Sequence, residues 1–440
     1  MVGMGVLLIA ITIILCFSFV ANDKDITAPA VLFPLGFAPS VICALLFSRR
    51  WGFEIHLNTQ LVIIGGIALF SLVATFLGKR MSADCQGKAA VASPPSWAAP
   101  GAIALACSLV FQIAVCVAVV LKVSSFFPDV SVYEAIGHFK ESKTFTTEYL
   151  SFGFPLNQIV NLCKAAGYYF AFLVAESLIS RKLSTKTLLS IGNLIVSAAM
   201  GFVLGGRFLG LGYIICTFMS YLMLRRRSGS TLNFKKLVIV VVVAAAVFLT
   251  LFQFLSFGRS GNIAFLDYIG IYLGAPIANL DAFLQEGGWG SSSPFGRMTF
   301  FCWYTYIGGK LGIADWQYAF DLPFREMAGF GMGNVYTTFY SFAYDFGYLG
   351  IIVLTALMGF FSELVYEKAL KIKESFASML LVIYSSFISY QLVFSFFSDK
   401  FYEEVLTPGT ITTAIYMIAA ILLMGLPNIL RRIRLEKSTR

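Results

Sequence analysis

Arginines that stand apart from the basic clusters are the side chains with the clearest chemical potential in this sequence. Arg207 lies in a glycine-rich junction between two apolar runs, and Arg259, Arg297 and Arg325 lie in the long stretch 258–343. A guanidinium group binds phosphate or pyrophosphate oxygens through paired hydrogen bonds. These arginines therefore predict an anion-binding site. The alternatives are that Arg207 snorkels to the water boundary and that the other three are solvated loop charges.

Asp345 lies where this long stretch meets the next apolar run, among tyrosines at helical spacing. A carboxylate there is either a general base that takes a proton from a substrate hydroxyl group or a charge that stabilises the start of a helix. Asn334, Tyr336 and Tyr344 lie close to it in sequence and are expected to bind substrate, with the tyrosine rings stacking on it. Tyrosine also collects at membrane interfaces without binding a ligand. Both pairs of alternatives stay open.

A polar face runs along the apolar segment 155–179. Its members recur at positions i, i+4, i+7 and i+11, which is one side of a helix: Asn157, Asn161, Lys164 and Tyr168. A lysine inside a membrane helix faces a cavity or the bundle interior rather than lipid. We expect Asn157, Asn161 and Lys164 to line a substrate cavity. The alternative is a structural hydrogen-bond network between helices.

Long apolar segments must hold these residues in place. Of the 440 residues, 58% are hydrophobic and 12% charged, whereas soluble domains are about 45–50% apolar and about 25% charged. The apolar runs are about 18–24 residues long, which suits membrane helices rather than barrel strands. We expect an all-α polytopic membrane protein, a single transmembrane domain over 1–440 with about eleven helices. The expected spans are 4–21, 27–47, 60–77, 101–122, 155–179, 187–205, 208–224, 237–256, 344–364, 376–397 and 409–427.

Basic clusters give the expected orientation of these spans. With eleven spans, all of the main clusters fall on one side: those that begin at Arg181, Arg225, Lys368 and Arg431. That side is cytoplasmic by the positive-inside rule. The stretch 258–343, between the eighth and ninth spans, is then an extracytoplasmic loop. Arg49 and Arg50 fall on the same outer side, against the rule.

Other features of the composition argue against several classes of protein. The eight cysteines and two histidines show no spacing typical of a zinc, haem or disulfide site, so no metal or other cofactor is expected. The net charge of +9 is concentrated at the ends of apolar runs, so no nucleic-acid partner is expected. Asp23-Lys24-Asp25 resembles a metal-binding Asp-x-Asp motif, but its place in a short turn indicates solvated charges.

The order of motifs along the chain resembles the Wzy-type O-antigen and oligosaccharide repeat-unit polymerases of bacterial inner membranes. The most specific likeness is the segment Asn334-Val335-Tyr336-Thr337 followed by Tyr344-Asp345-Phe346-Gly347-Tyr348-Leu349-Gly350. Gly206-Arg207 stands where that family tends to show Ser-Arg-Gly, with Gly206 and Phe208 in place of the serine and glycine. Further likenesses are Asp25-Ile26-Thr27-Ala28-Pro29-Ala30-Val31-Leu32-Phe33, Trp51-Gly52 and Leu57-Asn58-Thr59.

The resemblance implies a metal-independent glycosyltransferase with the GT-C-like architecture of lipid-linked enzymes. It would polymerise undecaprenyl-pyrophosphate-linked repeat units on the periplasmic face of the bacterial inner membrane, in contact with membrane lipid and with a Wzz-type chain-length co-polymerase. Arg207 and the loop arginines would neutralise the pyrophosphate, and Asp345 would deprotonate the acceptor. An O-antigen ligase is the nearest alternative. A lipid-linked oligosaccharide flippase or polysaccharide exporter is the alternative from another class, although no internal repeat is evident.

Overall fold

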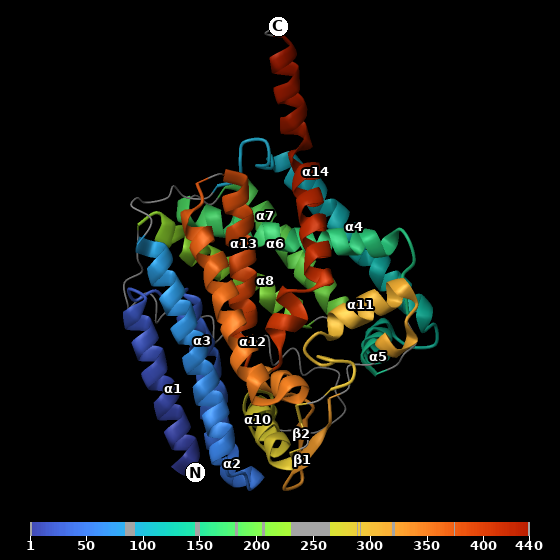
Figure 1. Ribbon diagram of the computed structural model, residues 1–440. Coiled ribbons are helices and arrows are strands. Elements are labelled where there is room, and N and C mark those ends of the chain that lie inside the picture. The colour runs from blue at the N-terminus through green and yellow to red at the C-terminus, as the bar shows by residue number, and fades with distance from the viewer. Residues whose placement is uncertain are drawn as a thin grey trace. The chain divides into compact units, whose positions relative to one another are not determined.

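The computed structural model describes residues 2–83, 93–145, 150–180, 184–204, 207–229, 265–287, 289–290, 292–318, 322–373 and 375–438 (Figure 1). Within these ranges, nine helices are long and apolar enough to cross a membrane. They are α1 (Val2–Ala21), α2 (Pro29–Trp51), α3 (Leu57–Ala83), α4 (Ala102–Phe126), α6 (Leu156–Ser180), α7 (Thr185–Val203), α12 (Thr338–Lys371), α13 (Ser375–Val393) and α14 (Pro408–Ser438). The expected class, a helical multi-pass membrane protein, is confirmed.

Two of the eleven expected spans do not correspond to any of the nine helices. The run 208–224 forms α8 (Arg207–Arg227), which is less apolar than the nine because three arginines close it. The expected span 237–256 lies outside the described residues. The other nine expected spans each coincide with one of the nine helices. The total number of spans and the GT-C-like arrangement stay predictions.

The stretch 258–343 holds shorter elements in its described part. They are α10 (Phe265–Glu286), α11 (Phe301–Leu311), the 3-10 turn η1 (Ala314–Trp316) and the antiparallel hairpin of β1 (Arg325–Met327) and β2 (Phe330–Gly333). α12 then begins at Thr338 rather than near 344, so Asp345 lies inside the helix and not at its start. The expected helix-start position of Asp345 is therefore wrong. At this start, the Thr338 backbone N–H donates to Ser395 O at 2.8 Å.

By its internal contacts the chain divides into two compact units. The first contains Met1–Gly87, Gly261–Ala369 and Phe387–Thr410. In it, α2 packs against α1, α3 and α10 (Figure 1). Its core is aromatic, with Phe33 stacked on Phe70 at 4.3 Å between ring centroids and Phe37 beside Phe339 at 5.7 Å.

A close backbone approach also shapes this first unit. A Cβ atom at Gly36 would lie 2.3 Å from the carbonyl oxygen of Val393. Glycine therefore lets α2 touch the end of α13 directly, which no larger residue permits without a shift. The short π-helical turn η2 (Phe401–Val405) follows that end of α13.

The second unit contains Lys88–Ser260, Leu370–Ser386 and Ile411–Arg440. In it, α4, α6, α7 and α8 pack side by side, and α5 (Val132–Phe145) packs on α4. A buried polar trio links two of these helices, because Gln112 donates to Asn193 at 2.6 Å and accepts from Ser197 at 2.6 Å. Such buried amide and hydroxyl groups are fully paired, as helix packing inside a membrane favours.

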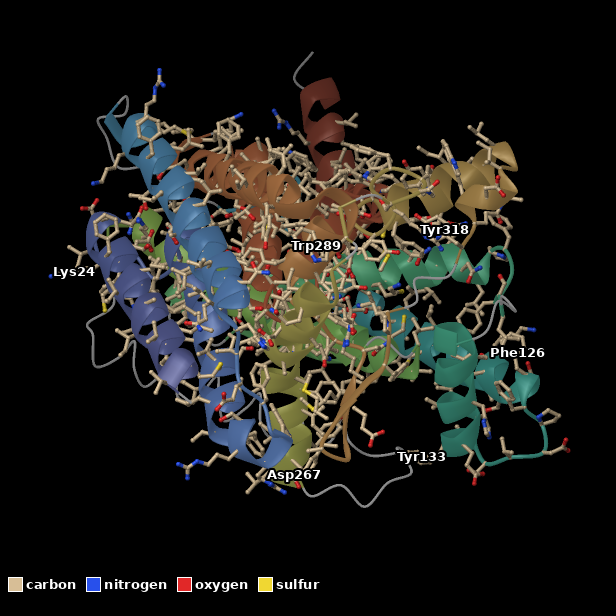
Figure 2. The ribbon with its side chains drawn as sticks, turned by 60° about the horizontal axis from the view of Figure 1, so that its bottom comes forward. Lys24, Phe126, Tyr133, Asp267, Trp289 and Tyr318 are labelled. Carbon is tan, nitrogen blue, oxygen red and sulfur yellow. The ribbon has the colours of Figure 1, made fainter. Side chains whose placement is uncertain are left out.

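Arg50 lies at the end of the first unit near the α2–α3 connection. In the expected orientation it is an exception to the positive-inside rule. Arg50 forms an ion pair with Asp267, a residue at the start of α10 that is labelled in Figure 2. Its guanidinium group also lies 5.4 Å from the centre of the Phe330 ring in β2. A basic residue with a local carboxylate partner adds little net charge to its side of the membrane. Arg50 is therefore compatible with an outer position for this end.

Candidate functional site

A buried carboxylate organises the turn that carries Arg297. Asp345 is only 2% exposed. Its oxygens accept the backbone N–H of Met298 at 3.1 Å and that of Thr299 at 2.7 Å. Thr299 adds a hydroxyl bond to Ser341 O at 3.3 Å. Hydrogen bonds from backbone N–H groups to a carboxylate are among the stronger kind, so α12 fixes this turn at the start of α11.

Arg297, in that turn, lies against an aromatic ring. Its guanidinium carbon lies 4.3 Å from the centre of the Tyr318 ring. The Tyr318 hydroxyl donates to the Arg297 carbonyl at 2.7 Å. Burial raises the pKa of Tyr318 to about 12, against the opposing charge of Arg297, so the phenol keeps its proton and remains a donor. Arg297 has no carboxylate partner among the described residues. It is thus a positioned, half-buried cation without an ion-pair partner in the described part of the chain.

Arg325 differs from Arg297 in having its charge compensated. Its two terminal nitrogens each donate to Glu286 at 2.6 Å, and its Nε donates to the Tyr336 hydroxyl at 2.8 Å. Hydrogen bonding to Arg325 lowers the pKa of Glu286, and the same bonds raise the pKa of Arg325. Arg325 therefore anchors the hairpin to the end of α10. Its guanidinium group has fewer free donors for an anion than that of Arg297.

Tyrosines at helical spacing stack on one another. The Tyr336 ring lies 4.2 Å from the Tyr340 ring, and the Tyr340 ring lies 5.8 Å from that of Tyr344. Phe283 of α10 packs on both Tyr340 and Tyr344. Tyr336 is 1% exposed, so its ring is not open to a substrate. This row mainly joins α10 to the start of α12.

The helix α12 is kinked directly after Asp345. Gly347 adopts φ +63°, a conformation that glycine reaches without strain, and the helix direction changes there. Gly290 donates to the Tyr344 carbonyl at 3.0 Å, and Trp289 meets the Tyr348 ring edge-on at 4.8 Å. Trp289 and Tyr318 are both labelled in Figure 2. The rings of Trp289 and Tyr348 therefore lie at the kink of α12, close to Asp345, which holds the Arg297 turn.

An exposed phenylalanine lies two residues before Arg297. Phe295 is 73% exposed, and its ring meets that of Phe346 at 4.7 Å. The Tyr304 hydroxyl donates to the Phe295 carbonyl at 2.6 Å. A fixed cation next to an exposed ring suits an amphiphilic ligand with an anionic group.

The predicted site residues of the second unit are placed on α6 and α8. Asn157 donates to the Ser151 hydroxyl at 2.9 Å, and the Lys164 carbonyl accepts the Tyr213 hydroxyl at 2.6 Å. Asn161 is half-buried on the same helix. Arg207 is the first residue of α8, and its side chain lies outside the described part. Arg259 also lies outside the described residues.

The remaining predicted binding residue, Asn334, is half-buried just after β2. The backbone on either side of it is held by Asn279, which donates to Met332 O at 3.3 Å and to Val335 O at 2.9 Å. Within the first unit, the structure thus joins Arg297 to Asp345 through the backbone and Arg325 to Tyr336 directly. The substrate-binding roles predicted for these residues stay predictions.

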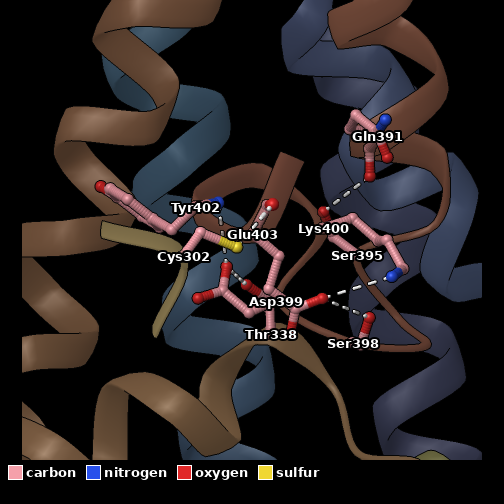
Figure 3. Close-up of polar contacts among 9 residues, drawn as sticks. All are labelled: Cys302, Thr338, Gln391, Ser395, Ser398, Asp399, Lys400, Tyr402 and Glu403. Carbon is pink, nitrogen blue, oxygen red and sulfur yellow. Dashed lines mark hydrogen bonds and ion pairs between the residues drawn. The ribbon is translucent and has the colours of Figure 1, made fainter. Parts of the chain in front are cut away.

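One charged cluster was not singled out from the sequence. Figure 3 shows Asp399, Lys400 and Glu403 around η2, facing Thr338 at the start of α12. Asp399 is 1% exposed and accepts from the Thr338 hydroxyl at 3.1 Å and from Tyr402 N at 3.4 Å. Lys400 and Glu403 form an ion pair at 3.2 Å. The sequence does contain a signal for this cluster, because a group of charged residues lies between two apolar runs. Charged residues within membrane segments are rare and usually functional.

The Asp-x-Asp segment near the start of the chain was expected to consist of solvated charges. Asp23 and Lys24 are exposed, and Figure 2 shows Lys24 at the turn after α1. Asp25, however, is 6% exposed and accepts the Thr27 backbone N–H at 2.9 Å and the Thr27 hydroxyl at 2.7 Å. It also accepts a hydrogen bond from Tyr366. The expectation of a solvated charge is therefore wrong for Asp25, because α12 supplies a buried hydroxyl partner.

Comparison of the chain with protein-family models, curated proteins and solved structures finds no match. In the part of the chain that the structure describes, no group of three or more His, Cys, Asp or Glu side chains is placed to hold a metal ion. The functional argument therefore depends on the residues and geometry given above.

Proposed function

We propose that the chain transfers glycosyl units from a lipid-linked pyrophosphate donor. In full, it would polymerise undecaprenyl-pyrophosphate-linked repeat units into O-antigen or a related polysaccharide, on the periplasmic face of the bacterial inner membrane. Two points support this proposal: the sequence resemblance to Wzy-type polymerases and the helical multi-pass fold.

The observation that carries the proposal is Arg297. Its guanidinium group is held over Tyr318, and its turn is fixed by Asp345. A cation held in this way, with no carboxylate partner among the described residues, suits a diphosphate. Negative charge develops on the pyrophosphate as its bond to the sugar breaks, and a preorganised cation stabilises that charge most in the transition state.

The reaction requires one bond to form and one to break. The acceptor hydroxyl oxygen bonds to the anomeric carbon of the donor sugar, and the bond from that carbon to the pyrophosphate oxygen breaks. Undecaprenyl pyrophosphate leaves with the electron pair, and the hydroxyl proton passes to a base or to water. In this proposal Asp345 positions Arg297. Its predicted role as general base would require its carboxylate to give up the hydrogen bonds from two backbone N–H groups, those of Met298 and Thr299.

The test uses the full-length protein in nanodiscs with its undecaprenyl-pyrophosphate-linked repeat unit. We expect wild type to produce a ladder of glycan lengths and Arg297→Ala to lose it. Lys310→Ala is the matched control, because Lys310 is an exposed cation on the adjacent α11 and should not affect the ladder. Equal loss in both variants, or a normal ladder from Arg297→Ala, would show that Arg297 is not the anion-binding group.

The products also separate the alternatives. A ligase would move a finished glycan onto a lipid A core acceptor and would give no ladder from repeat units alone. A flippase or exporter would carry the lipid-linked unit across a liposome membrane without changing its length.

A further inference from the structure

Three carboxylates lie near one another in the first unit, and they differ in how their charges are satisfied. Asp345 accepts from two backbone N–H groups, one of them shared between both of its oxygens. Glu403 has Lys400 at 3.2 Å and the Ser398 hydroxyl at 3.3 Å (Figure 3). Asp399 receives only a hydroxyl and one long backbone bond, both at Oδ1. Asp399 therefore has the weakest support for a negative charge.

Buried polar side-chain atoms in proteins usually have a hydrogen-bond partner. Asp399 Oδ2 is buried and has no hydrogen-bond partner among the described residues. An ionised carboxylate oxygen left bare in a buried site is very costly, whereas a protonated one is neutral. When carboxylates share a site, one of them takes up a proton because they repel each other when all are ionised.

We propose that Asp399 is a buried proton-binding site, with the proton held at neutral pH on the carboxyl group whose Oδ2 is unpartnered. The ligand is a proton exchanged with solvent. This inference goes beyond the proposed function, because it concerns protonation at η2 and needs no glycosyl transfer.

All elements packed around Asp399 contribute to its charge environment. Glu403 and Lys400 come from η2 and the residue before it, Asp345 from α12, and Cys302 from α11. Burial raises the pKa of Asp399 well above its ordinary value, and the charges of Glu403 and Asp345 raise it further. Burial also raises the pKa of the Cys302 thiol, to about 12, so this group stays neutral and donates to the Glu403 carbonyl at 3.3 Å.

The ion pair next to Asp399 is more exposed than Asp399 itself. The side chains of Lys400 and Glu403 are 17% and 14% exposed, whereas Asp399 is 1% exposed. Burial opposes the charge of Lys400, but Glu403, Glu404 and Asp399 together raise its pKa. The pair thus lies next to a buried carboxyl group and is itself partly exposed.

The test is infrared spectroscopy of the whole protein in nanodiscs at neutral pH. A protonated carboxyl group gives a carbonyl band at higher frequency than an ionised one, and this band shifts in heavy water. We expect wild type to show the band and Asp399→Asn to lose it. Asp315→Asn is the matched control, since it alters an exposed carboxylate of the same unit, and it should keep the band.

Isotope labelling keeps the test decisive if Asp399→Asn does not fold. Growth with isotope-labelled aspartate shifts an aspartic acid band and leaves a glutamic acid band in place. We expect the shift in both wild type and Asp315→Asn. Absence of the band from wild type, a band that does not shift with labelled aspartate, or retention of the full band in folded Asp399→Asn would each overturn the proposal.

Discussion

Asp345 and Thr299 are joined by a buried hydrogen bond of 2.7 Å from the Thr299 backbone N–H to the carboxylate, across 46 positions of sequence. Through this bond a membrane-spanning helix fixes the turn that carries Arg297. The carboxylate also accepts from Met298, so its removal would leave two backbone donors buried without partners.

We expect Asp345→Ala to lower stability by about 3 kcal/mol, because each buried donor left unsatisfied costs on the order of 1–3 kcal/mol. Asp345→Asn keeps one acceptor oxygen and should lose less. Thermal unfolding of the protein in nanodiscs measures both. Asp315→Ala serves as control, because Asp315 is an exposed carboxylate in η1 of the same unit. If Asp345→Ala unfolds at the wild-type temperature, the carboxylate does not hold the turn.

Replacement of Arg297 by lysine separates charge from geometry. Lysine keeps the positive charge but lacks the planar fork that binds two phosphate oxygens. We expect Arg297→Lys to slow glycan polymerisation by about 10²-fold, the effect of losing one preorganised donor in a transition state. Rates of ladder formation measure this loss. Tyr318→Phe keeps the ring under Arg297 and should fall much less, and a wild-type rate from Arg297→Lys would argue against a paired contact with the substrate.

Glu286→Gln tests whether Arg325 is a structural anchor. The Glu286 side chain is 57% exposed, so this ion pair is screened by water. We expect a loss of stability of about 0.5–1 kcal/mol that shrinks at high salt, as for other exposed pairs. Unfolding in low and high salt measures it. A loss of glycan polymerisation in Glu286→Gln with unchanged stability would instead assign Arg325 a direct role in the reaction.

Hydropathy was enough to predict most of the membrane helices, because in lipid the backbone must satisfy its own hydrogen bonds over a fixed thickness. It was weaker for α8, where Arg225, Arg226 and Arg227 dilute an otherwise apolar run. The stretch 258–343 was recognised as unusual in composition. Its hairpin and short helices were not, because short elements carry little periodic signal.

The candidate site was only partly predictable. Arg297 was proposed from its residue type, and the spacing of the tyrosines agrees with the ring contacts among Tyr336, Tyr340 and Tyr344. Hydrogen bonds between residues far apart in sequence were not predictable. Asp25 accepts a hydrogen bond from Tyr366, and Asp399 accepts one from Thr338. No local pattern specifies such pairs, since burial and hydrogen bonding at each position depend on the assembled helices.

The proton proposed on Asp399 predicts a pH dependence of stability with a definite sign. Burial raises the pKa of Asp399 in the folded protein, so the folded state holds this proton more tightly than the unfolded chain. The stability that the proton contributes is complete below the unfolded pKa of about 3.9 and is lost as pH rises through the folded pKa. We therefore expect unfolding temperature to fall with rising pH above neutrality, and to fall less in Asp399→Asn, whose amide does not ionise. Unfolding scans in nanodiscs from neutral to alkaline pH measure both slopes. Asp315→Asn, which alters an exposed carboxylate of the same unit, is the control that should keep the wild-type slope. Equal slopes in wild type and Asp399→Asn would contradict the assignment.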